Sequence, residues 1–187
     1  MIRWCSLWSV DLFRCESIVL RSYWVLVVMD LFTRRLVGIG VHCGAVNGAD
    51  LCCMFNAAIH GQGAPRHLST DHDPLFEAQR WTANLRILEI DEIKTVPNVP
   101  LSRPFVERVI GTMRREFLDQ VLFWNARDLE RKLAHFQVYY NAARSHASLK
   151  SDTPFTFAGE HKLPCAELHN VRWVSHCRDL VQLPVAA

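Results

Sequence analysis

The pattern of hydrophobic and polar positions begins with three segments that indicate β-strands. Residues 1–13 alternate loosely, residues 22–29 are almost entirely apolar, and residues 36–42 follow a polar break at 30–35. A continuous apolar run of this length is typical of a central strand that is covered on both faces. Because the connections are short, the three strands are expected to form an antiparallel meander.

The pattern then changes to the helical period. Over residues 47–60, apolar side chains recur at spacings of three and four, and glycines and a proline follow, which is typical of a helix and its C-terminus. Residues 67–70 predict a short strand that leads to Asp71. The next segment, from Asp73 to about residue 85, predicts a helix with proline in its first turn, and residues 93–96 predict a fifth strand.

A proline-rich loop at 97–102 runs into an amphipathic helix that carries Glu107. Glu107 is rotated about 100° from Val106 around the helix axis, at the edge of the apolar stripe. Taken alone, a surface glutamate in intrahelical ion pairs is the simpler interpretation. A carboxylate beside a buried face and several arginines also suits metal and phosphate chemistry. The stripe consists of Val106, Ile110, Met113 and Phe117.

A further helix over residues 127–143 completes the element order βββαβαβαα. Three antiparallel strands followed by alternating helices and strands predict an α/β fold with a mixed five-stranded sheet and helices on both faces. We predict one domain over residues 1–159. Residues 160–187 differ in character and are expected to form a C-terminal tail, either extended or a short hairpin.

Composition restricts the classes of function. Half of the 187 residues are hydrophobic and the net charge is +2, so a packed core is expected and any nucleic-acid footprint must be local. No apolar run approaches the length of about 18 residues that a membrane span needs, and the N-terminus does not resemble a secretory signal. The seven cysteines, an odd number, are expected to be buried free thiols in a reducing cytoplasm.

Three acidic residues occupy ends of the predicted elements. Asp11 is expected at the end of the first strand, Asp71 follows the fourth, and Glu107 lies in the first turns of a helix. If the first strand is central and the fourth lies beside it, their ends bring the two aspartates together. Clustered carboxylates repel one another unless a cation lies among them, and hard oxygen ligands favour Mg²⁺ or Mn²⁺. The alternatives are a turn cap for Asp11, a helix N-cap for Asp71, and an ion pair of Glu107 with Arg103.

Five segments, which together cover most of residues 4–155, form a recognisable series. They are WSVD ending at Asp11, YWVLVVMDLFTRRLVGIGV at 23–41, LSTDHDPLF with Asp71, RPFVERVIGTMRREFLD around Glu107, and YYNAARSHASLKSDTP at 139–154. In this order they resemble the catalytic core of the DDE integrases and transposases, of the retroviral-integrase type found in bacterial insertion sequences.

The resemblance implies an RNase H-like fold and an active site with two Mg²⁺ or Mn²⁺ ions held by Asp11, Asp71 and Glu107. The implied reaction has two steps. Water attacks a phosphodiester at the end of the element and frees a 3′-OH, which then attacks target DNA by direct transesterification without a covalent enzyme intermediate. The implied partners are element ends and target DNA. The implied setting is a bacterial nucleoid, with a homo-oligomer as the active form.

The sequence departs from the family pattern at two places. Such transposases usually carry a helix-turn-helix region before the core, whereas this chain starts at the first strand. A separately encoded helix-turn-helix protein is therefore one expectation, and a truncated, inactive remnant that only binds DNA or dimerises is another. After Asp71 stand His72 and Asp73, where the family commonly has Arg-Gly or Asn-Gly. An RNase H-like nuclease that hydrolyses DNA without joining it is the remaining alternative.

Arginines around the Glu107 helix are the candidate contacts for DNA phosphates. Arg114 ranks first because it lies two turns beyond Glu107 on nearly the same line, and Gly111 between them would allow a backbone or helix to approach closely. Arg34 and Arg35, after the second strand, are expected in a solvated turn. The DNA-binding candidates are Arg103, Arg108, Arg114 and Arg115.

Overall fold

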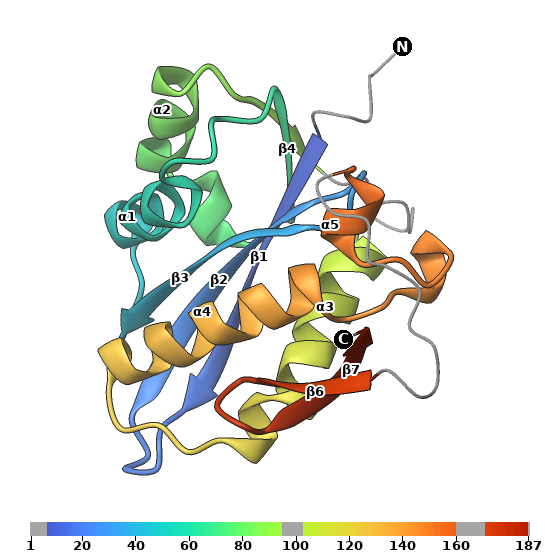
Figure 1. Ribbon diagram of the computed structural model, residues 1–187. Coiled ribbons are helices and arrows are strands. Elements are labelled where there is room, and N and C mark those ends of the chain that lie inside the picture. The colour runs from blue at the N-terminus through green and yellow to red at the C-terminus, as the bar shows by residue number, and fades with distance from the viewer. Residues whose placement is uncertain (1–6, 95–102, 160–170, 187) are drawn as a thin grey trace. The chain divides into compact units, whose positions relative to one another are not determined.

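The computed structural model describes residues 7–94, 103–159 and 171–186 (Figure 1). Its main element is a five-stranded sheet in the order β3-β2-β1-β4-β5. The pairs β1–β2 and β2–β3 are antiparallel, and β1–β4 and β4–β5 are parallel. The predicted mixed sheet with a central first strand is therefore confirmed. Its strands are β1 (Leu7–Glu16), β2 (Ser22–Asp30), β3 (Leu36–Cys43), β4 (His67–Thr70) and β5 (Asp91–Lys94).

Helices follow the strands in the predicted order, with one correction between β4 and β5. The single helix expected from Asp73 to about residue 85 is two helices, because Ala78 has an extended backbone. Phe76 and Trp81 would point to different sides of one continuous helix, whereas the break at Ala78 lets both side chains be fully buried. The helices are α1 (Gly48–Ile59), a 3-10 helix (Pro74–Glu77), α2 (Gln79–Ile87), α3 (Arg103–Glu116), a 3-10 helix (Leu118–Gln120), α4 (Ala126–Ala142), a 3-10 helix (Ala147–Leu149) and α5 (Pro154–Phe157).

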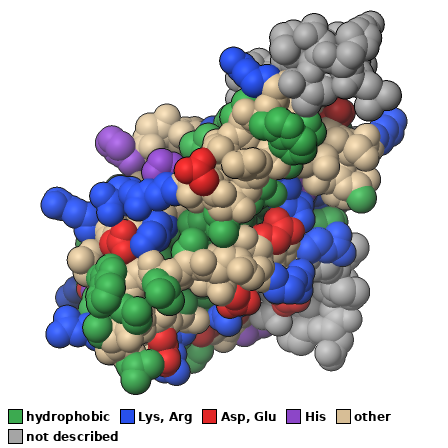
Figure 2. Space-filling model, turned by 60° about the horizontal axis from the view of Figure 1, so that its bottom comes forward, with side chains coloured by type: hydrophobic (Ala, Val, Ile, Leu, Met, Phe, Trp, Pro, Cys, Tyr) green, Lys and Arg blue, Asp and Glu red, His purple; other side chains and the backbone are tan. Residues whose placement is uncertain are grey.

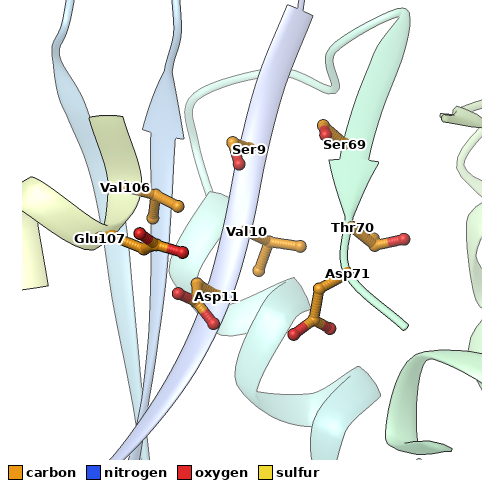
Figure 3. Close-up of a pocket in the computed structure, with 8 residues that line it drawn as sticks. All are labelled: Ser9, Val10, Asp11, Ser69, Thr70, Asp71, Val106 and Glu107. Carbon is orange, nitrogen blue, oxygen red and sulfur yellow. The ribbon is translucent and has the colours of Figure 1, made fainter. Parts of the chain in front are cut away.

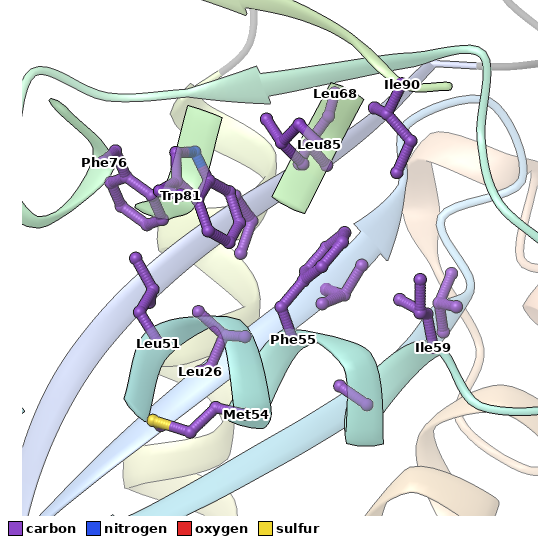
Figure 4. Close-up of a cluster of buried hydrophobic side chains, with 14 residues drawn as sticks. Leu26, Leu51, Met54, Phe55, Ile59, Leu68, Phe76, Trp81, Leu85 and Ile90 are labelled. Carbon is purple, nitrogen blue, oxygen red and sulfur yellow. The ribbon is translucent and has the colours of Figure 1, made fainter. Parts of the chain in front are cut away.

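The core lies between the sheet and helices α1 and α2 (Figure 4). Alternate residues of β2 enter it, among them Leu26 and Val28, and Trp81 packs edge-on against Phe55 with ring centroids 5.1 Å apart. Val25 and Val27 alternate to the other face of the sheet and are buried as well. Helices therefore cover both faces, as the uninterrupted apolar run of this strand predicts.

The chain divides into two compact units, Met1–Glu130 and Arg131–Ala187. The second contains most of α4, then α5 and an antiparallel hairpin of β6 (Val171–His176) and β7 (Val181–Ala186). Within this unit the rings of Tyr139 and His176 lie 5.8 Å apart. The domain limit expected after residue 159 stays a prediction.

The cysteines and the helices bear on two further expectations. Among the described residues the cysteines are free thiols, but of these only Cys177 is buried. Cys15 and Cys52 are half-buried and Cys43 and Cys53 are exposed, so the expectation of buried thiols holds only in part for Cys15 and Cys52 and is wrong for Cys43 and Cys53. These last two lie where a strand or helix presents its outer side, at the end of β3 and on α1. In the parts of the chain that the structure describes, no helix combines the length and apolar character of a membrane span.

Candidate active site

Strands β1 and β4 place Asp11 and Asp71 at the same level of the sheet. Ser9 pairs with Ser69 in the parallel register, and each aspartate lies two residues further along. Side chains two residues apart share a face of a strand. Asp11 is therefore on the same face of the sheet as Ser9, and Asp71 on the same face as Ser69. The prediction that Asp11 lies at the end of its strand is wrong. Strand β1 continues to Glu16 because it stays paired with β2 after β4 has diverged.

The same alternation decides which face carries the carboxylates. Val10 and Leu68 enter the core beneath α1 and α2, so Asp11 and Asp71 belong to the opposite face, where α3 contacts β1 and β2. Glu107 comes from this helix. The three carboxylates line one cavity of about 250 Å³ (Figure 3). Its lining residues are Ser9, Val10, Asp11, Ser69, Thr70, Asp71, Val106 and Glu107.

Helix α3 presents Glu107 at the edge of its buried side, as its period predicts. Val106, Ile110, Met113 and Phe117 are all buried, whereas Glu107 is exposed. In Figure 3 the Glu107 carboxylate is directed toward Asp11, and the Asp71 carboxylate lies just beyond the end of β4, on the other side of β1 from Glu107. A strand interior, a strand end and a helix thus converge on one cavity.

Local hydrogen bonds orient the two aspartates. One Asp11 oxygen accepts a bond from the backbone N–H of Leu12 at 2.8 Å, and one Asp71 oxygen accepts from the N–H of Asp73 at 3.0 Å. The latter closes an Asx turn. The cap of the following 3-10 helix is Asp73, whose side chain accepts from the N–H of Leu75 at 2.8 Å. The alternative that Asp71 is a helix N-cap is therefore wrong.

Glu92 is a residue near the cavity that the sequence did not single out. Its Oε1 accepts hydrogen bonds from the Thr70 hydroxyl at 2.6 Å and from the Trp81 indole N–H at 3.2 Å. Thr70 lines the cavity and directly precedes Asp71. Glu92 therefore ties the end of β4 to the core. The predicted fifth strand began one residue too late to include it, since β5 starts at Asp91.

The donor chemistry of the cavity fits a hard divalent cation. Every polar side chain that lines it offers oxygen, from three carboxylates and the hydroxyls of Ser9, Ser69 and Thr70. Such ligands favour Mg²⁺ or Mn²⁺ over softer metals. Over the described residues, however, no three Asp, Glu, His or Cys side chains converge on a single ion position. Coordination of one ion by all three carboxylates would require these side chains to draw together.

The candidate DNA-binding arginines do not all surround the carboxylate cavity, as the sequence had suggested. Arg108, Arg114 and Arg115 are exposed on α3, and the side chain of Arg103, like the loop at 97–102, lies outside the described residues. Arg114 does not line the carboxylate cavity. Its guanidinium donates to the carbonyl of Arg14 at 3.1 Å, and both residues line a separate cavity of about 320 Å³.

Two further expectations near α3 are resolved by the contacts. Among the described residues no backbone packs closely against Gly111: the nearest atoms to a Cβ built there belong to the Arg115 side chain, at 3.6 Å. The Arg34 guanidinium carbon lies 3.2 Å from the ring centroid of Phe105, so Arg34 is not simply in solvent.

Burial raises the pKa of Cys15 to about 11, partly offset by the Arg114 guanidinium, so this thiol stays protonated at neutral pH.

Comparisons with known proteins support the fold and the resemblance of this chain to integrase catalytic cores. Residues 88–154 match the family described as an integrase core domain. An uncharacterized 39.2 kDa protein of insertion element IS476 from Xanthomonas euvesicatoria is 28% identical over 155 residues, which are 83% of this chain and 44% of that protein. The resemblance to an integrase catalytic core is confirmed.

Solved integrase cores share the architecture. A chain of the simian T-cell lymphotropic virus intasome matches with a TM-score of 0.66 and 18% identity, over 90% of this chain and 62% of that one. The HTLV-2 integrase core in complex with magnesium gives 0.61 and 18%, over 84% and 97%. The bovine immunodeficiency virus (BIV) core gives 0.59 and 19%, over 83% and 95%. The predicted RNase H-like fold class is thereby confirmed. The chain spans less than half of the length of its insertion-element relative.

Proposed function

We propose that this chain is the catalytic core of a bacterial DNA transposase that cleaves and joins DNA strands with divalent cations. The observation that carries the proposal is the shared cavity of Asp11, Asp71 and Glu107 in an integrase-core fold. The insertion-element relative supports a mobile-element origin. The same proposal has the protein act on element ends and target DNA, as a homo-oligomer in the nucleoid.

In this proposal Asp11, Asp71 and Glu107 hold two Mg²⁺ or Mn²⁺ ions. Two such ions about 4 Å apart would stabilise the attacking and leaving oxygens of an in-line displacement at phosphorus. The residues of the chain divide the remaining work. The Asx turn orients Asp71, and Glu92, through Thr70, holds the strand end that carries it. The HTLV-2 neighbour was solved with magnesium, which supports this choice of ion.

The direct test follows labelled duplex that carries an element end, with and without target plasmid, in Mg²⁺ and in EDTA. A transposase core gives both nicked ends and joined products, and both disappear in EDTA. Nicked products without joining would instead establish the nuclease alternative. Binding without any metal-dependent product, measured in parallel by filter retention, would establish the inactive alternative.

Arginines on α3 are proposed to bind phosphates, and Arg114 provides the sharpest test among Arg103, Arg108, Arg114 and Arg115. We expect Arg114→Ala to weaken DNA binding equally for all sequences. Removing one phosphate contact should reduce the slope of log affinity against log salt by about 0.9. Fluorescence anisotropy over a salt series measures this slope.

Arg86→Ala is the matched control, because Arg86 is an exposed arginine in the last turn of α2, the helix that covers the other face of the sheet. It should leave the salt dependence unchanged. A slope for Arg114→Ala equal to that of the wild type would exclude a phosphate contact at this position.

A further inference from the structure

Large apolar side chains lie exposed where β1 turns into β2. The turn and the loop that precedes α4 are adjacent, because the N–H of Ile18 donates to the carbonyl of Phe123 at 3.1 Å. Figure 2, which brings the bottom of Figure 1 forward, shows hydrophobic side chains gathered at this end of the molecule. We call the group the turn–loop patch. Its members, between 42% and 80% exposed, are Ile18, Val19, Leu20, Leu122 and Trp124.

The exposure does not come from a loosely held loop. Between Leu122 and Trp124, Phe123 is buried and packs edge-on against Tyr23, with ring centroids 5.5 Å apart. The N–H of Trp124 donates to the Asp128 carboxylate at 3.3 Å, and the N–H of Asp128 donates to the side-chain oxygen of Asn125 at 3.0 Å. Phe123 thus anchors the loop, and the two flanking side chains are directed outward.

Leu20 adds an independent observation. Its φ of 58° lies in the left-handed region, which favours glycine and asparagine and is unfavourable for a bulky apolar residue. Its side chain is nevertheless 80% exposed. Neither the backbone conformation nor burial in the chain's own core explains a leucine here. A contact outside this chain would explain it, because contiguous exposed apolar patches mark interaction sites.

Charges of both signs border the patch. Glu16 and Arg21 flank the turn, and Arg14 pairs with Glu16 at 3.9 Å. Asp119 is exposed on the segment before the loop and lines the same cavity as Arg14. Arg114 lines that cavity too, so the border holds three arginines and two carboxylates and does not form the single-sign basic surface that a phosphate backbone favours. An apolar centre with a border of both signs is instead self-complementary, as the interface of a two-fold dimer must be.

We propose that the turn–loop patch is a self-association surface through which two copies of this chain pack about a two-fold axis. The apolar centres meet, and the arginines of one copy face the carboxylates of the other. The proposal does not depend on catalysis. Its five side chains are few beside the roughly 20–30 residues that each partner contributes to a standard interface, so we expect a dimer with a dissociation constant in the micromolar to millimolar range.

Sedimentation equilibrium of the full chain over this concentration range measures the association. We expect Leu20→Asn to weaken the dimer about tenfold or more, because a large central apolar contact is lost. The same change should raise the thermal midpoint of the monomer, since asparagine tolerates the left-handed conformation. Trp124→Ser, which leaves the turn intact, should weaken the dimer comparably.

Ile87→Asn is the matched control, because Ile87 is also 80% exposed but lies at the end of α2. It should not affect association. A wild-type chain that stays monomeric throughout would overturn the proposal. So would a dimer that neither patch variant weakens, or that the control weakens equally. Hydrogen exchange that shows the turn protected by duplex DNA, and not by higher protein concentration, would assign the patch to nucleic acid instead.

Discussion

Asp71→Asn is expected to abolish DNA cleavage and joining together, by several orders of magnitude, without lowering the free energy of unfolding. The substitution keeps the shape of the side chain and removes one negative charge from the carboxylate cavity. Cation binding weakens, and the charge that develops at phosphorus loses its stabilisation. In the proposed mechanism one site serves both steps, so both should fall together. Stability in EDTA should hold or rise, since one of three mutually repelling carboxylates is gone.

Asp73→Asn is the matched control for this experiment. Asp73 lies two residues from Asp71 but caps the following 3-10 helix and does not line the cavity. Asparagine caps a helix almost as well as aspartate, so activity and stability should both stay near wild type. Strand-transfer assays in Mg²⁺ and urea unfolding in EDTA supply the two measurements. Joining retained in the Asp71→Asn variant, or lost equally in both variants, would refute the catalytic assignment of Asp71.

The sequence predicts the sheet well because hydrophobic alternation and continuity are strong, local signals. The apolar run of β2 predicts a strand buried on both faces, and the order of the predicted elements favours a mixed sheet with β1 at the centre beside β4. The juxtaposition of Asp11 and Asp71 then follows from topology. The exact placement of Asp11 inside β1 does not, because it depends on β2 pairing beyond the point where β4 departs.

Features that arise from tertiary packing could not be predicted from local patterns. The break at Ala78 exists because Phe76 and Trp81 both enter the core, which no helical period reveals. Glu92 acquires its role through hydrogen bonds to residues 22 and 11 positions away. In the sequence it stands between Asp91 and Ile93, and no motif singles it out. The close approach of α1 to β3 is a third such feature, and it is possible because the glycines of β3 have no side chain at the contact.

We expect Gly38→Ala to destabilise the fold by about 3 kcal/mol or more. Gly38 and Gly40 share one face of β3, and α1 packs against them. A Cβ at Gly38 would lie 1.8 Å from the carbonyl oxygen of Ala58, and one at Gly40 would lie 2.6 Å from that of Met54. Both obstacles are backbone atoms, so a rotamer change cannot relieve them. The helix would have to move away from the sheet and open the core that includes Phe55.

Gly111→Ala tests the same substitution where the structure offers room. Gly111 lies inside α3, and within the part of the chain that the structure describes a Cβ there meets only the flexible Arg115 side chain, at 3.6 Å. Alanine should therefore stabilise the chain by about 0.5–1 kcal/mol, because it restricts the unfolded backbone and favours the helix. Urea titrations of both variants give the free energies of unfolding. The backbone of α1 contacts Gly38, whereas Gly111 has no such contact among the described residues. The two substitutions should therefore change the free energy of unfolding in opposite directions. A Gly38→Ala variant as stable as the wild type would mean that α1 does not pack this closely on β3.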